Sequence, residues 1–302
     1  IPVLFLAVAV AAPAQELTSD FQPPHGASND LPRDAREGQL GPWNTRILEA
    51  VSKDGLHWQR TGRIVADQAD VPCALVDDQG RVWLYSVTWA RAARNRIVVA
   101  IGGGDTWVHK RVEIEGLERG WANPVDPTVV RMKDGRIRLY FTSNGGRGRP
   151  RTFSAVSWDG LRFKIEEGVR FEAGRRVLDP SVLSTSSGYV LFAGGGPDGN
   201  YMAVSEDGLD FEQVEAPRLD GLILSNGLAI SNGFRYYAFT QKGPPGTPRQ
   251  IQSLSSRDGR RWKVEPGVRL APDRSSRLET AEVKDPTVVR MPDGSYRMYY
   301  VT

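Results

Sequence analysis

A strong internal repeat constrains the fold of this chain more than any other feature. Residues 126–143 read DPTVVRMKDGRIRLYFTS and residues 285–302 read DPTVVRMPDGSYRMYYVT, and the two segments agree at 11 of 18 positions. Weaker copies occupy residues 71–88, 179–194 and 224–240. Each copy has a β-rich run, a tight turn with Gly and a second β-rich run with aromatic residues, which is the pattern of a β-hairpin. The chain therefore contains five related hairpins.

A second recurring unit lies between these hairpins. Its pattern is Ser-x-Asp-Gly-x-x-aromatic, and it is found at residues 51–59, 156–164, 204–212 and 255–263, with a degenerate copy at 101–110. The Asp-Gly pair favours a turn between two strands, and the aromatic residue is placed to pack over a sheet. This unit predicts a second, outer set of five hairpins.

Five inner and five outer hairpins predict an all-β chain, a five-bladed β-propeller with four-stranded blades. No segment has apolar residues at the helical spacing over three turns, so few helices compete. The chain begins with an outer hairpin (residues 45–63) and ends with an inner one (residues 284–302). We expect the N- and C-termini to close one blade together, which removes exposed sheet edges.

The first residues predict export. Residues 1–14 carry no charge and end in Ala12-Pro13-Ala14, the small-x-small pattern of a signal-peptide cleavage site. The predicted division is a signal peptide at 1–14, an irregular segment at 15–42 and the propeller at 43–302. The mature protein is then secreted or periplasmic and free of the membrane, whereas the alternative for residues 1–14 is a buried strand or helix.

Composition excludes several functional classes. Cys73 is the only cysteine, so an intramolecular disulfide is excluded, and its apolar neighbours favour a small buried residue over a nucleophile. Lys and Arg number 39 against 36 acidic residues, a balance that disfavours nucleic acid as a partner. His25, His57 and His109 are scattered, so we expect no metal site and no cofactor. We expect a monomer.

Functional groups are expected on one face of the ring. The turns on one face are short and alike, whereas the loops on the other are long and dissimilar, and variable loops on a rigid scaffold commonly carry function. Asp126, Asp179 and Asp285 stand at the start of three inner strands, nearest these loops, and each is followed by Pro. In these features the mature chain resembles the five-bladed superfamily of glycoside hydrolase families 43 and 32, which includes arabinanases, xylosidases, invertases and levansucrases.

The resemblance implies a glycoside hydrolase. The family uses three carboxylates from the first, third and fourth blades, and the three Asp-Pro pairs have this cyclic spacing if the blade closed by the termini is first. Asp285 is then the base or nucleophile, Asp126 holds the substrate, and Asp179 is the general acid. This chain departs from the family at the acid, where the family typically has Glu. Asp is one methylene shorter, and the loop acids Glu172, Glu279 and Glu282 are alternative donors.

Two other interpretations remain open at this level. Asp-Pro in equivalent places can be repeat architecture, because Asp caps a strand start and Pro sets the turn into it. The chain is then a non-catalytic glycan-binding or scaffold propeller that has lost the acid. A sialidase-like protein ranks third, because sialidase aspartate boxes have a different spacing and sialidases have six blades.

The expected partner is an oligo- or polysaccharide of plant or microbial origin. Trp89 and Trp121 lie on or near the variable loops, and aromatic faces stack on sugar rings. Asn144, Arg147 and Arg149 occupy a Gly-rich loop that could grip an anionic group. Arginine outnumbers acidic residues in these loops, which favours an acidic sugar. Each Trp could equally anchor its loop, and a solvated loop is the default interpretation of residues 144–151.

Overall fold

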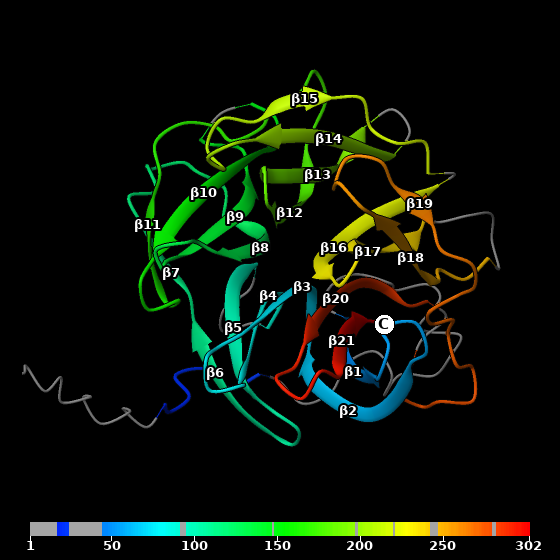
Figure 1. Ribbon diagram of the computed structural model, residues 1–302. Coiled ribbons are helices and arrows are strands. Elements are labelled where there is room, and N and C mark those ends of the chain that lie inside the picture. Colours follow the sequence, from blue (N-terminus) through cyan, green and yellow to red (C-terminus); the bar gives the residue numbers. More distant parts are fainter. Residues whose placement is uncertain are drawn as a thin grey trace, which may run out of the picture.

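The protein is a five-bladed β-propeller. The computed structural model describes residues 17–23, 44–90, 95–146, 148–196, 199–219, 221–241, 247–279 and 282–302. These residues form 21 strands and no α-helix, and the strands make five antiparallel sheets around a central axis (Figure 1). The predicted all-β, five-bladed architecture is confirmed.

Each blade runs from an inner strand to an outer edge strand. Blade 1 consists of β20 (Lys284–Arg290), β21 (Tyr296–Val301), β1 (Arg46–Ser52) and β2 (Gln59–Asp67). Blade 2 consists of β3 (Ala69–Val76), β4 (Val82–Thr88), β5 (Arg96–Gly103) and β6 (Thr106–Arg111). Blade 3 consists of β8 (Val125–Arg131), β9 (Ile137–Ser143), β10 (Arg151–Ser157) and β11 (Arg162–Ile165). Blade 4 consists of β12 (Leu178–Thr185), β13 (Gly188–Gly196), β14 (Gly199–Ser205) and β15 (Glu212–Val214). Blade 5 consists of β16 (Leu222–Ile230), β17 (Gly233–Thr240), β18 (Ile251–Ser256) and β19 (Lys263–Val264).

Blade 3 has one strand more than predicted. The connection from blade 2 forms β7 (Glu113–Glu115), which pairs in parallel with β11 and covers the outer edge of the blade. An uncovered edge strand presents unpaired backbone groups to other chains, so this added strand protects the edge.

Blade 1 is closed by the two ends of the propeller sequence. Strand β1 pairs with β21 in antiparallel register, from Ile47 opposite Val301 to Ser52 opposite Tyr296. Arg46 and Thr302 exchange two backbone hydrogen bonds of 3.1 Å. The ring thus has no seam at this blade, as the unpaired first and last hairpins predict.

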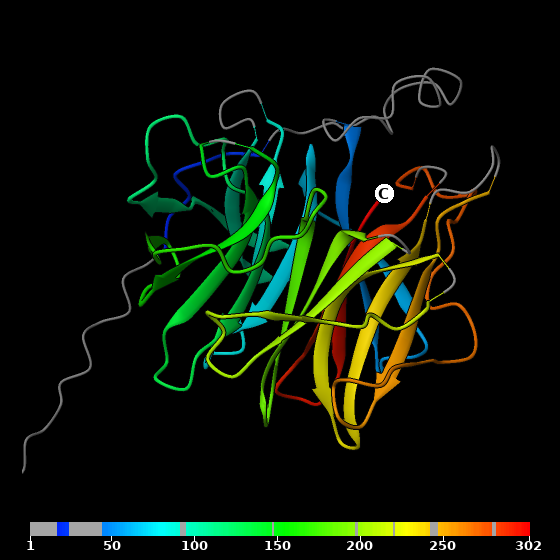
Figure 2. The same cartoon turned by 90° about the horizontal axis from the view of Figure 1, so that it is seen from above.

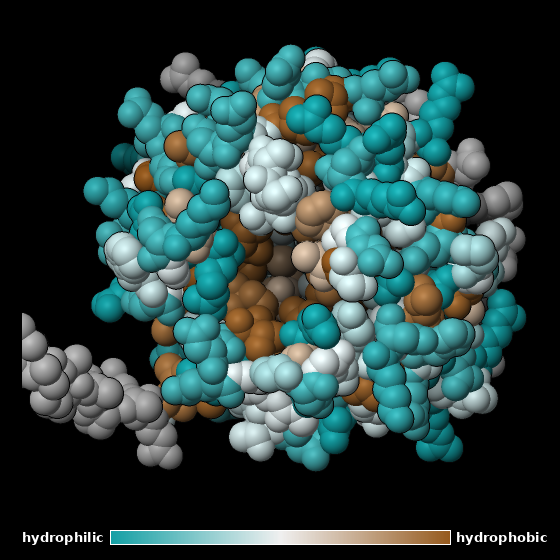
Figure 3. All heavy atoms as spheres, in the orientation of Figure 1, coloured by the Kyte–Doolittle hydropathy of each residue, from teal (hydrophilic) through white to brown (hydrophobic). Residues whose placement is uncertain are grey.

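The two faces of the ring differ as the sequence predicts. Short hairpin turns lie along the lower edge of Figure 2, and longer loops lie along the upper edge, where the C-terminus also lies. We call these the turn face and the loop face. The turn face points toward the viewer in Figures 1 and 3, and Figure 3 shows a central hollow on it that is edged by hydrophobic side chains.

The Ser-x-Asp-Gly unit forms the same turn in each of its four complete copies. In the first copy the Ser52 hydroxyl accepts a hydrogen bond of 2.9 Å from the Gly55 N–H, and Asp54 Oδ1 accepts the N–H groups of Leu56 and His57. The glycine has a positive φ of 72°, a conformation that costs glycine little. These bonds satisfy the backbone of the turn and set the position of the aromatic residue that follows.

The aromatic residue of each outer hairpin packs on the neighbouring blade. At all five joints it meets an aromatic residue of the preceding blade edge-on, with ring centroids 5.8 to 6.3 Å apart and planes 74° to 86° apart. Such edge-to-face pairs contribute about 0.5–1.5 kcal/mol beyond area burial. The pairs are Trp58–Tyr237, Phe163–Tyr85, Trp107–Tyr299, Phe211–Tyr140 and Trp262–Phe192.

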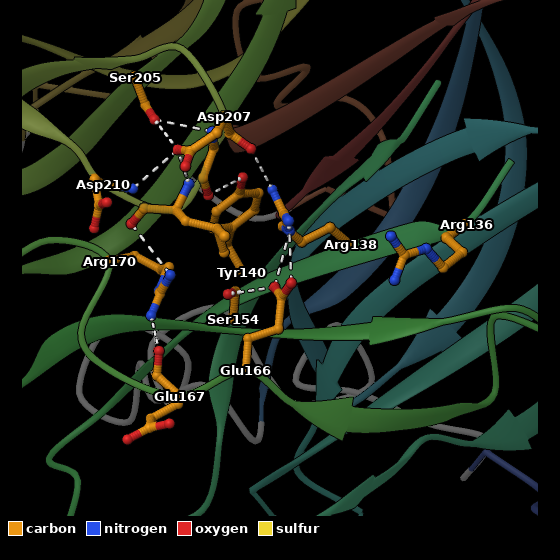
Figure 4. Close-up of polar contacts among 12 residues, drawn as sticks. Arg136, Arg138, Tyr140, Ser154, Glu166, Glu167, Arg170, Ser205, Asp207 and Asp210 are labelled. Atoms are coloured by element: carbon orange, nitrogen blue, oxygen red, sulfur yellow. Dashed lines mark hydrogen bonds and ion pairs between the residues drawn. The ribbon is translucent and has the colours of Figure 1, made fainter. Parts of the chain in front are cut away.

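Polar contacts reinforce these joints. Between blades 3 and 4, the Tyr140 hydroxyl donates to the Gly208 carbonyl at 2.8 Å, and the Arg138 guanidinium donates to the Asp207 carbonyl at 2.8 Å (Figure 4). Glu166 pairs with Arg138 at 2.8 Å and accepts a bond from Ser154. The equivalent contacts recur between blades 5 and 1, where Tyr237 and Arg235 donate to the carbonyls of Gly55 and Asp54 and Arg235 pairs with Glu265.

The inner strands are also joined around the axis by side chains one position after the Pro of the bulge, or after Ser225 in blade 5. Thr287 Oγ1 accepts the Ala74 N–H at 3.0 Å, and Asn226 Oδ1 accepts the Val288 N–H at 2.9 Å. Cys73 takes the same place in blade 2, where its sulfur accepts the Val129 N–H. Its side chain is buried, and burial raises the pKa of the thiol. Cys73 is thus a packing residue, as its apolar setting predicts.

The described part of the N-terminal segment lies along the outer edge of blade 2 (Figure 1). The Asp20 N–H donates to the His109 carbonyl at 3.1 Å, and the Asp20 carboxylate pairs with Lys110 at 3.0 Å. Phe21 is buried against Ala90 and Val98. Residues 17–23 therefore cover the edge strand β6. Residues 1–14, predicted to be a signal peptide, lie outside the described residues.

Candidate functional site

The three predicted aspartates occupy identical irregularities at the start of their inner strands. Strand pairing skips from Val125 to Thr128 in blade 3, and the same skip occurs in blades 4 and 1. Asp126, Asp179 and Asp285 lie in the skipped positions with φ of 56°, 49° and 46°. A positive φ is uncommon for a residue other than glycine, although Asp tolerates it better than most.

Blade 2 shows that this bulge belongs to the fold. Its pairing skips between Asp70 and Cys73, and Val71 there has φ of 47°. A β-branched residue is a clear outlier in this conformation. Val71 has an aliphatic side chain that cannot take part in catalysis, so the strained backbone alone does not mark the other three positions as catalytic. Whether they are catalytic depends on the environment of their side chains.

The three carboxyl groups do converge on the loop-face mouth of the channel. Asp126 Oδ2 accepts the Asp179 N–H at 3.3 Å. Burial and then the nearby charges of Asp126 and Asp285 raise the pKa of Asp179 well above its ordinary value. Burial also raises the pKa of Asp126, to which Asp285 adds. Asp126 and Asp285 thus act on the ionisation of Asp179, although the three residues are far apart in the sequence.

Lys284, directly before Asp285, belongs to the same cluster. Its ammonium donates to Asp285 Oδ2 at 2.6 Å, and both side chains are largely buried, at 14% and 12% exposure. Burial alone would lower the pKa of Lys284, but the carboxylates of Asp285 and Asp70 raise it above its ordinary value. Lys284 is therefore a fixed positive charge at the mouth.

Asp70 is a fourth carboxyl group of the site. It lies in blade 2 one residue before the bulge, is buried, and accepts a hydrogen bond of 3.0 Å from the indole N–H of Trp89. Burial raises the pKa of Asp70 to about 7, against the opposing effects of Lys284 and Trp89. A carboxyl group that titrates near neutrality at a channel mouth is typical of functional sites.

Asp70 and Lys284 were missed in the sequence because both stand one position before the recurring Asp-Pro or Val-Pro pair. The corresponding residues in blades 3 and 4 are Val125 and Leu178, so the repeat suggests an apolar position there. The signal that could have found them is this alignment: two blades carry a charge where the other two carry an aliphatic residue.

The predicted substrate-binding residues divide into two groups. Trp89 lies at the mouth, tied to Asp70. Trp121 instead packs on Phe153 with ring centroids 4.5 Å apart, against the core of blades 2 and 3. Asn144 Oδ1 accepts the N–H groups of Ala122 and Gly146, so it organises its own loop.

The arginines of this Gly-rich loop face other partners. Arg149 is exposed and donates to the Gly174 carbonyl. Arg147 lies outside the described residues. Trp121 therefore anchors its loop on the core, and Asn144 holds the backbone of its own loop. Arg149 binds the Gly174 carbonyl.

The three alternative loop acids lie in different surroundings. Glu279 is buried and held by Arg60 and by the Tyr300 hydroxyl at 2.7 Å, so it is a structural residue. Glu172 is exposed and pairs with Arg151 at 3.3 Å. Glu282 is the one whose charge acts on Lys284, and it also pairs with Arg249 at 3.7 Å. Of the three, only Glu282 is connected to the carboxyl cluster.

The described residues contain no group of three or more His, Cys, Asp or Glu side chains arranged to hold a metal ion. Within the same ranges, no helix is long and apolar enough to span a bilayer.

Comparison with known proteins finds relatives in structure but not in sequence. No known family matches the sequence, and no curated protein matches it either. A thermostable family-43 glycoside hydrolase superposes with a TM-score of 0.60 at 13% identity, covering 77% of this chain and 88% of the other. An α-L-arabinofuranosidase from Clostridium thermocellum superposes with a TM-score of 0.54 at 18% identity, covering 77% and 80%. The chain has the fold of the family-43 glycoside hydrolases.

The same fold also carries other carbohydrate chemistry. An N-acetylgalactosamine deacetylase from F. plautii, solved in complex with blood group B trisaccharide, superposes with a TM-score of 0.53 at 14% identity and covers 85% of this chain and 95% of the other. At these identities the likeness shows the fold, and the site must decide the chemistry. Five blades rather than six separate this chain from the sialidase architecture.

Proposed function

We propose that the protein is a glycoside hydrolase whose reacting groups are Asp285, Asp126 and Asp179. The observation that carries the proposal is that these carboxyl groups, from the first, third and fourth blades, lie together: Asp126 Oδ2 accepts the Asp179 N–H at 3.3 Å, and burial and the charges of Asp126 and Asp285 raise the pKa of Asp179. Hydrolysis of a glycosidic bond requires one carboxyl group that is protonated and one that is ionised. The similarity in fold to family-43 enzymes supports the same reaction class.

The environments of the three groups suggest their roles. Asp285 forms an ion pair with Lys284 and is the group suited to act as base or nucleophile. Among the described residues no cation forms an ion pair with Asp179, and its raised pKa favours the protonated form that a general acid needs. Asp126 is suited to hold the substrate, because it accepts the Asp179 N–H and can accept a substrate hydroxyl with its remaining lone pairs.

The competing candidate is a non-catalytic glycan-binding propeller. Val71 favours it, because the same bulge persists where no carboxylate is present. Under this alternative, the aspartates cap strands and contribute to stability alone.

Substitution by Asn distinguishes the two candidates. We expect Asp285→Asn and Asp179→Asn each to lower kcat by a factor of about 100 or more, since each removes a proton-transfer group. Asp179→Asn should recover on an aryl glycoside with a strongly acidic leaving group, which needs no protonation, whereas Asp285→Asn should not. Equal loss of melting temperature in these two variants and in Asp126→Asn, with no hydrolysis by the parent protein, would instead support the scaffold.

The charge of the cluster suggests a neutral sugar at the centre of the site. Lys284 is already paired with Asp285 at 2.6 Å, and the other titratable groups of the cluster, Asp70, Asp126 and Asp179, are acids, so the described residues of the cluster offer a uronate no unpaired cation. The acidic-sugar prediction therefore applies only to outer subsites near the rim arginines. Export of the protein remains a prediction from the sequence.

A further inference from the structure

The residue directly before each strand bulge differs among the blades. In blade 3 it is Val125 and in blade 4 it is Leu178, whereas in blade 1 it is Lys284. Successive side chains of a regular strand point to opposite faces. The bulge at Asp285 breaks this alternation, and the Lys284 ammonium consequently reaches Asp285 Oδ2 at 2.6 Å.

The surroundings of Asp285 contain other acids and little compensating charge. Asp70 of β3, Asp126 of β8 and Asp179 of β12 act on the cluster, and Glu282, two residues before Lys284, acts on the lysine. Strand β16 of blade 5 (LILSNGLAI) has no titratable residue. Lys284 is thus the cation that faces this group from the inner strands.

We propose that Lys284 is a positioning residue that keeps Asp285 ionised and turns its Oδ1 toward the substrate, so that the residue before each bulge decides which aspartate acts as the base. This inference extends the proposed function, because it assigns the cause of the charge on the base. Val125 before Asp126 and Leu178 before Asp179 carry no charge. Asp126 and Asp179 are therefore the groups that hold protons.

The physical reason is the cost of placing several negative charges in one buried site. Like charges at close range disfavour joint ionisation, and a cation within hydrogen-bonding distance favours the charged form of its partner. Only Asp285 has that partner, and an ammonium paired at 2.6 Å with a carboxylate also holds it in one orientation. Lys284 thereby removes the symmetry that the repeat imposes on the three Asp-Pro bulges.

The experiment follows the carboxyl carbons of the full-length protein labelled with ¹³C-aspartate as the pH is varied. Asp285 is assigned from its loss in Asp285→Asn. In the parent protein we expect Asp285, paired with Lys284, to be ionised at pH values at which Asp126 and Asp179 still hold protons. In Lys284→Met, a neutral residue of similar length, the Asp285 midpoint should move upward by about 1 to 3 pH units, the usual effect of losing an opposite charge. Lys284→Arg should restore most of the parent behaviour.

An Asp285 signal that titrates together with Asp126 and Asp179 in the parent protein would overturn the inference, even if Lys284→Met fails to fold. An unchanged midpoint of the Asp285 titration in a folded Lys284→Met variant would overturn the inference as well. On an active enzyme, the acidic limb of kcat/KM against pH should shift upward with the same midpoint, with kcat affected more than KM at low pH. If the titrations behave as expected but the parent protein hydrolyses no glycan, the charge assignment stands and the proposed function fails.

Discussion

At the scale of single residues, the protein uses one backbone shape for different purposes. The bulge with positive φ places Asp126, Asp179 and Asp285 at the channel mouth, and it places Val71 there as well. Strained φ values of this kind cost about 1–3 kcal/mol each and persist only where the surrounding structure imposes them. Their presence in four blades indicates that the strand start imposes the shape, and that the side chain then determines whether the position can do chemistry.

Asp70 gives a prediction for the pH dependence of stability. Its pKa rises from 3.8 to about 7 on folding because the carboxyl group is buried. Between these values the folded protein binds more protons than the unfolded chain, so Asp70 lowers the free energy of unfolding as the pH rises from about 4 to 7. Asp70→Asn should therefore stabilise the protein above about pH 7, by an amount on the order of a few kcal/mol, and have little effect near pH 4.

Thermal melting of both proteins across this pH range measures the effect. Asp78→Asn is the matched control, because Asp78 is an exposed residue on the turn between β3 and β4. A stabilisation by Asp70→Asn that is the same at every pH would show that the ionisation of Asp70 does not contribute.

At the scale of elements, the joints between blades account for most of the recurring sequence pattern. The aromatic residue after Asp-Gly is preserved because it packs edge-on against the preceding blade. Where Phe192 replaces the tyrosine of the inner hairpin, the Gly259 carbonyl is still satisfied, because the Trp262 indole donates to it at 3.1 Å. The carbonyl of the turn glycine is thus hydrogen-bonded at both kinds of joint, by a tyrosine hydroxyl in one and by a tryptophan indole in the other.

Removing the donor at a tyrosine joint should be costly. Tyr140 is fully buried, and its hydroxyl donates to the Gly208 carbonyl. Tyr140→Phe keeps the ring pair with Phe211 but leaves that carbonyl without the bond, so we expect a loss of about 1–3 kcal/mol in the free energy of unfolding.

Chemical denaturation of Tyr140→Phe and Tyr189→Phe provides the measurement. Tyr189 lies near the same turn, and its hydroxyl has no hydrogen-bond partner among the residues that the structure describes, so this control should change stability little. Equal losses in the two variants would mean that the cost does not come from the hydrogen bond to the Gly208 carbonyl.

At the scale of the whole molecule, charge is sorted by distance from the axis. Acidic groups and Lys284 lie at the mouth, and arginines lie in the loops around it. Several of these arginines are already paired, as in Arg151 with Glu172 at 3.3 Å and Arg249 with Glu282 at 3.7 Å. The rim is therefore less free to bind anions than a count of arginines suggests.

This arrangement predicts the response to a panel of glycans. Neutral arabinan, xylan or fructan should be hydrolysed in preference to polygalacturonate, and the rate on the neutral glycan should change little with salt, because screening affects charged ligands. Rates at low and high ionic strength give the comparison. A preference for the uronate polymer that weakens as salt is added would instead support recognition by the rim arginines.

The sequence by itself determined the architecture of the ring. A repeated hairpin pattern specifies one local shape wherever it occurs, so the number of copies predicts the number of blades, and the incomplete copies at the two ends predict the closed blade. The same reasoning placed Asp126, Asp179 and Asp285 at one mouth, because equivalent positions in a ring of repeats lie at the same height around the axis.

The tertiary structure decided what the repeat does not encode. Asp70 and Lys284 became part of the site because two blades depart from the consensus, and only the assembled ring shows which charges then meet. Trp121 and Asn144 became loop supports because Phe153 and the N–H groups of Ala122 and Gly146 lie beside them. Local pattern governs the shape of each hairpin through backbone geometry, whereas ionisation and binding depend on distances between side chains from different blades, which only the closed ring sets.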